Sequence, residues 1–143
     1  MEGRILAIDY GRKRYGLAIS DELGITSRPL KMLTRTNRRD DLRRLRLLAR
    51  ENSVRIIVVG LPLRLDGTAG EMAEEVKRFA TRLTQNLGLP VELIDERLTS
   101  WEAGEIELEI ARGEKNDGHR DDIAAALILR DYLAKRSSAS GER

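Results

Sequence analysis

The sequence predicts an α/β fold, a mixed five-stranded sheet with helices on its faces. Residues 4–9 and 54–60 are near-continuous apolar runs of strand length, which is typical of strands buried on both faces. In the second half of the chain, predicted strands alternate with predicted helices. That alternation implies right-handed βαβ crossovers and parallel pairing.

At the start of the chain, three strands are expected to form an antiparallel meander. Residues 4–9, 15–21 and 28–33 have strand character, and residues 11–14 form a short connection between the first two. The first strand ends in an acid, Asp9, at the edge where ligands collect in sheets of this kind.

The helix expected from about residue 38 to residue 51 has two distinct faces. Its apolar stripe consists of Leu42, Leu45, Leu48 and Ala49. Another face carries arginines at positions i, i+4, i+7 and i+11, which are Arg39, Arg43, Arg46 and Arg50. Arginine suits bidentate phosphate binding without sequence preference, so these are candidate nucleic-acid contacts, although a solvated helix face explains the stripe about as well.

After the strand at 54–60, the chain enters the loop GLPLRLDG, residues 60–67. The loop lacks the Lys-Ser/Thr ending of a Walker loop, so it is not a P-loop. Its backbone either lies beside a substrate or only connects a strand to a helix. That next helix is expected to begin at Thr68, which has capping-box spacing with Glu71, and to end at Gly88.

The last third of the chain is expected to hold a fifth strand and two helices. The strand covers residues 91–96, and the capping-box pair Thr99 and Glu102 begins a helix that ends at about residue 112. Residues 113–118 read as a loop, which His119 follows without an assigned role, and a final helix covers residues 120–136.

Composition excludes several classes of chemistry. The chain has 143 residues and no cysteine, so disulfides, thiolate nucleophiles and cysteine-type zinc sites are excluded, and a cytoplasmic protein is expected. No apolar run is long enough for a signal peptide or a membrane span. We expect one domain over residues 1–136 and a flexible tail over 137–143.

The net charge is only +2, but the charges are segregated along the sequence. Seven arginines lie between residues 35 and 50, whereas residues 92–109 carry seven acids against Arg97 alone. This distribution suits a protein that holds an anionic partner and also keeps a cluster of carboxylates, although charge runs are more often solvated faces.

Asp9 is the first candidate site residue. A carboxylate at the end of a central strand loses hydration and needs a cation, which is either a metal ion or a neighbouring arginine such as Arg12 or Arg14. Arg12, Lys13 and Arg14 follow Asp9 directly and are candidate phosphate contacts. Gly11 permits a tight turn and a close approach of phosphate to the backbone.

Two further pairs of acids lie far along the chain. Asp95 and Glu96 end the fifth strand, and because adjacent strand residues point to opposite faces, only one of them can share the side of Asp9. Either acid could instead pair with Arg97. Asp121 and Asp122 fall in the first turn of the last helix, where the helix dipole favours acids in any case.

Four blocks of the sequence carry a family resemblance. The segments IDYGRKRYGLA, VVGLPLRLDG, DERLTSWEA and RDDIAAALIL are similar to the four signature blocks of the YqgF/RuvX family, bacterial proteins of the RNase H-like superfamily. They occur in the same order, and the resemblance covers about residues 4–133. It implies an RNase H-like fold with sheet order 3-2-1-4-5, related to the Holliday-junction resolvase RuvC.

The resemblance also implies a set of catalytic acids. It favours Asp9, Glu96 and Asp121 as catalytic residues and metal ligands, with Asp95 and Asp122 as second choices. Many relatives have serine in place of Asp122, which leaves it as a second ligand or a helix cap. Hard divalent cations prefer carboxylate oxygens, so the expected cofactor is Mg²⁺ or Mn²⁺. Two such ions could activate a water and stabilise the leaving 3′ oxygen.

The resulting hypothesis is a metal-dependent nuclease that acts on structured nucleic acid. The resemblance favours maturation of the 5′ end of pre-16S rRNA, with the resolution of branched DNA, a Holliday junction, as the alternative. Its expected nucleic-acid contacts are Arg12, Lys13, Arg14, Arg39, Arg43, Arg46, Arg50 and Arg97. The protein is expected to be a monomer or a homodimer, without a membrane partner.

Two other classes of function remain open. One is a non-catalytic nucleic-acid-binding maturation factor that kept the acidic pocket. The other is an actin-like phosphotransferase, which shares an Asp-x-Gly sequence at a strand end but closes two such domains over ATP, whereas this chain is expected to have one.

Overall fold

The computed structural model describes residues 3–64, 66–95 and 119–141. Along the chain, its elements are β1 (Arg4–Tyr10), β2 (Arg14–Ser20), β3 (Ser27–Thr34), α1 (Arg38–Glu51), β4 (Val54–Leu61), α2 (Glu71–Leu87), β5 (Val91–Asp95) and α4 (His119–Gly141). The helix expected from Thr99 and the loop at 113–118 lie outside the described residues.

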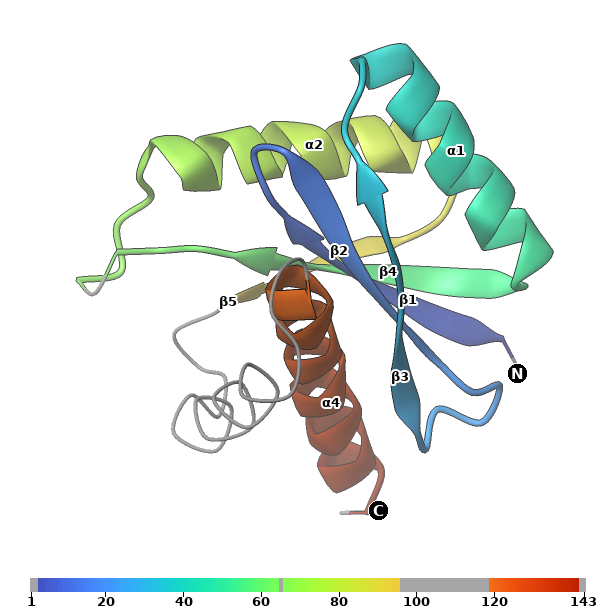
Figure 1. Ribbon diagram of the computed structural model, residues 1–143. Helices are drawn as coiled ribbons and strands as arrows, with labels where there is room; N and C mark the ends of the chain where they lie inside the picture. The colour runs from blue at the N-terminus through green and yellow to red at the C-terminus, as the bar shows by residue number, and fades with distance from the viewer. Residues whose placement is uncertain (1–2, 65, 96–118, 142–143) are drawn as a thin grey trace.

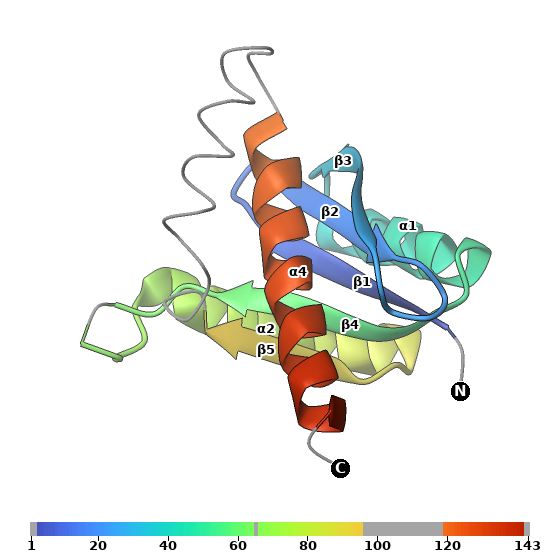
Figure 2. The ribbon, with the colours of Figure 1, turned by 90° about the horizontal axis from the view of Figure 1, so that it is seen from below.

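The five strands form one mixed sheet in the order β3-β2-β1-β4-β5. β2 pairs antiparallel with both β1 and β3, while β4 pairs parallel with both β1 and β5. The predicted fold class and strand order are therefore confirmed. Helices α1 and α2 lie on one face of the sheet and α4 lies on the other (Figure 1; Figure 2).

The central strand β1 is buried on both sides and supplies both halves of the core. Leu6 and Ile8 pack toward α1 and α2, and Ile5 and Ala7 pack toward α4. All four side chains are at most 2% exposed. This alternation fixes which face every later residue of β1 must take, and it puts Asp9 on the side of α4 and Tyr10 on the side of α1 and α2.

Helix α1 has the bounds that the sequence predicts. Asn37 is its N-cap, and the Asn37 side chain accepts a hydrogen bond of 2.9 Å from the backbone N–H of Asp40. Asp40 and Asp41 occupy the first turn, where the positive end of the helix dipole favours acids.

Helix α2 begins later than the capping-box prediction at Thr68. The Thr68 backbone N–H and hydroxyl both donate to Oδ1 of Asp66, at 2.9 and 2.7 Å. The threonine side chain is therefore used in the turn before the helix, and Gly70 becomes an N-cap that has no side-chain hydrogen bond. The predicted end is confirmed, because Gly88 adopts a φ of 69° and its N–H donates to the Thr84 carbonyl.

Helix α4 is longer than the sequence predicts. It begins at His119, which was expected to precede the helix, and it continues to Gly141 instead of ending at residue 136. Residues 137–140 contain no glycine or proline, so no strong helix breaker interrupts the helix before Gly141. In the described part of the chain, no helix combines the length and apolar character that a membrane span requires.

Candidate active site

Asp9 lies near the carboxyl end of the central strand, on the α4 side of the sheet. Its side chain is half-buried. The four residues before it, Ile5–Ile8, are buried, so the position of the Asp9 backbone is fixed by the core on both faces.

The sheet surface on both flanks of Asp9 carries no side chain. Asp9 pairs with Gly16 of β2. On its other flank, the Ile8–Val59 pair of β1 and β4 places Gly60 next in register. Both glycines lack a Cβ, and both are buried in the structure. Of these three paired positions, Asp9 therefore contributes the functional side chain on the α4 face.

Asp95 does not share this face. It is the last residue of β5 and pairs with Leu61, which packs into the core formed by α1 and α2. The neighbouring positions Glu92 and Ile94 face the other way. The Tyr132 hydroxyl of α4 donates to Glu92 at 2.7 Å, and Ile94 packs with the α4 core. Asp9 and Asp95 therefore lie on opposite faces of the sheet.

The other predicted acids lie at the margins of the described structure. Glu96 and Arg97 lie outside the described residues. Asp121 and Asp122 belong to the first turn of α4, and the structure describes only their backbone.

The direction of α4 brings its first turn toward the Asp9 end of the sheet. Near the other end of the helix, Leu133 packs beside Gly24 in the β2–β3 turn. Tyr132 bonds Glu92 near the start of β5. Both contacts lie at the end of the sheet opposite to Asp9, so the helix must begin near the Asp9 end.

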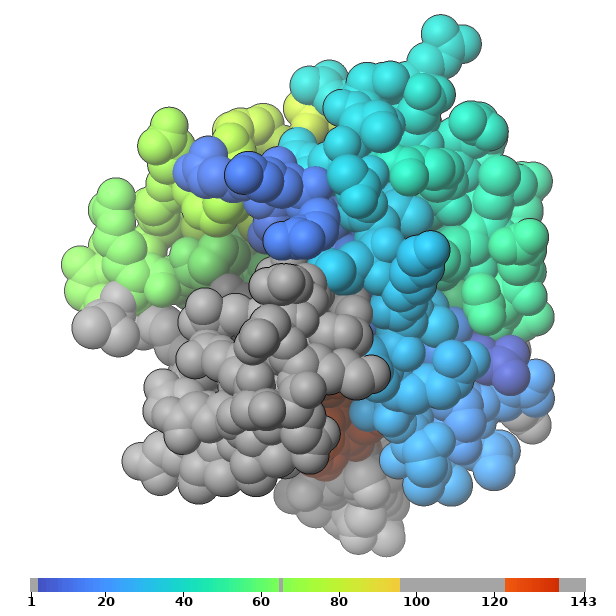
Figure 3. Space-filling view, viewed as in Figure 1, coloured from blue at the N-terminus to red at the C-terminus, as the bar shows by residue number. Residues whose placement is uncertain are grey.

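The cations that follow Asp9 form the β1–β2 turn. Arg12 and Lys13 are exposed, whereas Arg14 is half-buried. The turn is closed by the Gly11 N–H, which donates to the Arg14 carbonyl at 3.0 Å, and it is tied to the β3–α1 connection by the Arg35 N–H, which donates to the Lys13 carbonyl at 2.9 Å. Figure 3 shows this blue turn at the surface between α2 and the beginning of α1.

The predicted arginine stripe of α1 is on the other side of the sheet from Asp9. Arg39, Arg43 and Arg50 are exposed, and Arg43 lies 3.8 Å from Asp40. Arg46 is half-buried, and its Nε is a buried atom without a hydrogen-bond partner in the described structure. The structure thus does not join this stripe to the face that carries Asp9.

The predicted substrate loop after β4 closes on itself. The Arg64 N–H donates to the Thr68 carbonyl at 2.9 Å, and Leu63 and Ala69 form an isolated antiparallel bridge. Gly67 provides the left-handed backbone of the turn with a φ of 89°. The loop leaves the sheet at the carboxyl end of β4, the strand next to β1, so it lies at the Asp9 end.

Sequence reasoning missed a pocket on the α1 and α2 side of the sheet. Its volume is about 380 Å³, and four arginines line it: Arg35, Arg38, Arg78 and Arg82. Arg78 and Arg82 are four residues apart on α2, which is a visible signal for one helix face. Their meeting with Arg35 and Arg38 depends on helix packing, which no local pattern reveals.

Asp9 carries the kind of oxygen ligand that hard divalent cations prefer, but one carboxylate does not make a metal site. In the described ranges, no three histidine, cysteine, aspartate or glutamate side chains come together as a metal site. The side chains of Glu96, Asp121 and Asp122 lie outside the described residues, so the structure does not place them relative to Asp9.

The sequence matches one protein family and relatives that share a single name. The family model RuvX, described as Holliday junction resolvase, matches residues 3–135. A protein of Koribacter versatilis is 45% identical over 137 residues, which cover 95% of this chain and 90% of the relative. A protein of Syntrophus aciditrophicus is 47% identical over 134 residues, which cover 91% and 87%. Both carry the name "Putative pre-16S rRNA nuclease".

Two solved structures with a similar fold are Holliday junction resolvases. Thermus thermophilus RuvC in complex with a Holliday junction substrate has a TM-score of 0.62 at 16% identity, covering 94% of this chain and 96% of RuvC. The fowlpox virus Holliday junction resolvase has a TM-score of 0.53 at 16% identity, covering 92% and 99%. At this identity the likeness shows the RNase H-like fold.

Proposed function

Because this chain belongs to the RuvX family, we propose that it is a nuclease that hydrolyses phosphodiester bonds of structured nucleic acid in the 5′-end processing of pre-16S rRNA. The observation that carries the proposal is the placement of Asp9, within the family match, at the carboxyl end of the central strand between two glycines. Relatives that share more than 40% of their residues with this chain are named for that substrate.

The proposed metal ligands are Asp9, Glu96 and Asp121, with Asp122 as an additional candidate from the same turn of α4. The alternation of β5 supports Glu96 over Asp95, because Glu92 and Ile94 face α4 and Asp95 faces the opposite side. The chemistry that two Mg²⁺ or Mn²⁺ ions supply at such a site is activation of a water and stabilisation of the leaving 3′ oxygen.

The remaining contribution of the chain is to hold the phosphate backbone beside Asp9. Arg12 and Lys13 are exposed in the turn that begins two residues after Asp9. Guanidinium and ammonium groups at this place attract phosphates by charge and hydrogen bonding, so they position a strand without reading its sequence. Arg14 and Arg97 are proposed to assist, as are the four arginines of the α1 stripe where a large substrate wraps around the sheet.

A direct assay tests the proposal. Purified protein is incubated with a labelled 16S rRNA precursor that retains its 5′ extension, in Mg²⁺, in Mn²⁺ and in EDTA. We expect cleavage in either metal, none in EDTA, and a loss of about 100-fold or more in Asp9→Asn. Asp40→Asn, which removes an acid on the other side of the sheet, is the matched control and should cleave like wild type. Equal cleavage by wild type and Asp9→Asn would overturn the proposal.

A second candidate substrate is a four-way DNA junction, because the matching family model is described as Holliday junction resolvase. The same reaction run with a labelled junction in place of the RNA decides between the two substrates. Faster cleavage of the junction than of the precursor, again dependent on Asp9, would establish this alternative.

A further inference from the structure

The arginine-lined pocket lies on the opposite face of the sheet from Asp9 but at the same end. Its walls are α1 and α2, and its floor includes Tyr10 and Tyr15 from the β1–β2 hairpin. Tyr10 follows Asp9 directly in β1, so the two backbone positions are about 3.8 Å apart while their side chains point to opposite faces. The pocket is therefore one strand thickness away from the candidate active site.

The charges of the pocket do not balance within it. Four arginines face two acids, Asp41 and Glu75. Asp41 already accepts a hydrogen bond of 2.6 Å from Arg44, a residue outside the lining, and further bonds from Thr36 and Tyr15. Glu75 alone is left against the four arginines, so the cavity keeps a strong positive charge.

Arg35 is held rigidly and shapes the floor. Its Nη1 donates to the Gly11 carbonyl at 2.8 Å, and its guanidinium lies 4.8 Å from the centre of the Tyr10 ring and 5.4 Å from that of Tyr15. These contacts fix the guanidinium before any ligand arrives. Its positive charge is not cancelled by them, because a carbonyl and two neutral rings carry no formal charge.

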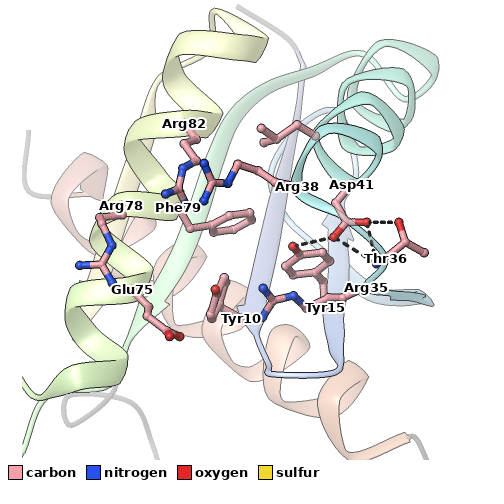
Figure 4. A pocket seen from close by; sticks show the side chains of 11 residues that line it. Tyr10, Tyr15, Arg35, Thr36, Arg38, Asp41, Glu75, Arg78, Phe79 and Arg82 are labelled. Carbon is pink, nitrogen blue, oxygen red and sulfur yellow. Dashed lines mark hydrogen bonds between the residues drawn. The ribbon is translucent and has the colours of Figure 1, made fainter.

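The other three arginines keep their guanidinium groups available. Within the described part of the chain, the guanidinium groups of Arg38, Arg78 and Arg82 form no ion pair or hydrogen bond. In Figure 4, Arg38 extends from α1 toward Arg82 of α2, and Arg78 lies one turn before Arg82 in α2. Three like charges repel one another in this arrangement, so a bound anion would remove an unfavourable interaction as well as form new ones.

We propose that this pocket is a phosphate-binding site in which Arg38, Arg78 and Arg82 bind the phosphate groups of the nucleic-acid substrate, on the face of the sheet opposite to the active site. The identification of the source as the substrate strand rests on the proposed function. The chemistry itself rests on the pocket, because planar guanidinium forks that converge from two helices match phosphate oxygens. The volume also admits a free nucleotide, which is the other source of the same chemistry.

Backbone contact is favoured over base stacking in this pocket. Tyr15 and Phe79 stack on each other with ring centres 5.3 Å apart, and they are only 3% and 4% exposed. Arg35 covers the neighbouring Tyr10 ring. The aromatic faces are thus already occupied, so the groups that remain for a ligand are the guanidinium ions.

The test measures binding in EDTA, where no cleavage is required. The probe is a fluorescently labelled single-stranded RNA and a labelled RNA hairpin, titrated with the full chain over a series of salt concentrations. We expect Arg78→Gln/Arg82→Gln to weaken binding about 10-fold or more at low salt and to lower the slope of log K against log salt by about one to two. The control Lys135→Gln/Arg136→Gln removes the same charge from the exposed end of α4 and should change affinity less than about twofold.

A second double variant separates the loss of charge from the loss of guanidinium geometry, and a folding check accompanies it. Arg78→Lys/Arg82→Lys keeps both charges but loses the planar forks, so it should keep most of the salt slope and still bind less tightly. Near-UV circular dichroism checks that each variant is folded. A salt slope and an affinity equal to wild type in folded Arg78→Gln/Arg82→Gln would overturn assignment to the substrate strand.

A calorimetric arm distinguishes the two sources of phosphate. Wild type is titrated with pyrophosphate and with adenosine monophosphate, and the same titration is made with Arg38→Gln. In one outcome, the small ligands bind in an arginine-dependent way but RNA binding is unchanged in the variants. That result would support the phosphate chemistry of the pocket, but it would assign the site to a free nucleotide and reject the substrate strand as the source. If the variants change neither RNA nor small-ligand binding, the whole proposal is wrong. These binding assays contain no metal, so they do not depend on cleavage. If RNA binding depends on the arginines but the metal-dependent cleavage assay fails, the proposed nuclease function is rejected and the phosphate site is retained.

Discussion

The Tyr15 hydroxyl donates a hydrogen bond of 3.2 Å to Oδ2 of Asp41, and this contact joins strand β2 to helix α1. Both side chains are buried, with exposed fractions of 3% and 2%. Asp41 also accepts from the Thr36 N–H and hydroxyl and from Arg44. A carboxylate with so many donors holds the first turn of α1 against the sheet and positions one wall of the arginine pocket.

Asp41→Asn is expected to lower the free energy of unfolding by about 1–3 kcal/mol at neutral pH, because the buried donors lose their charged acceptor. Burial by itself raises the pKa of Asp41, but hydrogen bonds from Arg44, Thr36 and Tyr15 lower it more, so the pKa lies below the ordinary value of 3.8. The native carboxylate therefore adds stability that is present above the unfolded pKa and is lost as the pH falls through the folded pKa.

Urea unfolding at pH 7 and at pH 3 measures this contribution. The difference between wild type and Asp41→Asn should shrink in acid. Asp40→Asn, which changes a half-exposed neighbour in the same turn, should lose at most about 1 kcal/mol at pH 7. A difference for Asp41→Asn that is the same at both pH values would contradict the assigned role.

Alkaline titration is expected to show two tyrosines that ionise late. Burial raises the pKa of Tyr15 to about 12, with the nearby Asp41 adding to the effect and Arg35 opposing it. Burial and the hydrogen bond to Glu92 raise the pKa of Tyr132 to about 12. Since both folded values exceed the ordinary value of 10.0, their contribution to stability is complete below pH 10 and is lost as the pH rises from 10 to 12.

The phenolate absorbance of wild type, Tyr15→Phe and Tyr132→Phe measures this behaviour. Each substitution should remove one late-ionising group and leave the other. In a contradicting result, a variant lacks part of the absorbance rise near pH 10 but keeps the full rise near pH 12. The tyrosine that it removed is then not the buried group that the structure indicates.

Gly11→Ala is expected to destabilise the turn that carries Arg12 and Lys13. A Cβ at Gly11 would overlap the Arg14 carbonyl oxygen, which also accepts the Gly11 N–H. The turn must therefore open, at a cost of about 1–3 kcal/mol, and RNA binding should weaken with it. Gly88→Ala is the matched control: nothing lies within 4 Å of its Cβ, so its cost of about 1 kcal/mol comes from the φ of 69° alone.

Thermal unfolding and RNA affinity, measured on both alanine variants, separate the two effects. Loss of stability without loss of affinity in Gly11→Ala would mean that the β1–β2 turn does not contact nucleic acid. Weakened affinity in Gly88→Ala would show that destabilisation alone reduces binding.

Local sequence patterns predicted the bounds of a helix correctly where its own residues determine those bounds. The bounds of α1 follow from its leucine spacing, and the structure adds the cap at Asn37. The start of α2 was wrong because Asp66 takes the Thr68 side chain for a turn, and a capping-box spacing cannot reveal that competition. The pocket was missed for a related reason, since Arg38 and Arg82 meet only through the packing of α1 beside α2.

The candidate acids show the same limit in a sharper form. Asp9 could be singled out from the sequence because it ends a buried run. The choice between Asp95 and Glu96 depends on which of the two side chains points to the α4 face of the sheet, and the sequence of β5 does not show this. The pairing of Asp95 with Leu61 answers the question, because it places Asp95 on the α1 and α2 face. It yields a prediction that separates two adjacent residues with the same chemistry.

Glu96→Gln should lower metal-dependent cleavage about 100-fold or more, whereas Asp95→Asn should lower it less than about tenfold. The reason is that Asp95 lies on the α1 and α2 side of the sheet, while the α4 side holds Asp9, Glu92 and Ile94. Cleavage rates at saturating Mg²⁺, with thermal unfolding as the check on folding, measure both variants. If Asp95→Asn is the inactive variant and Glu96→Gln cleaves normally, the ligand set built on Asp9 and Glu96 is wrong. The alternation of β5 must then break after Leu93, so that the Asp95 side chain lies on the same face as Asp9.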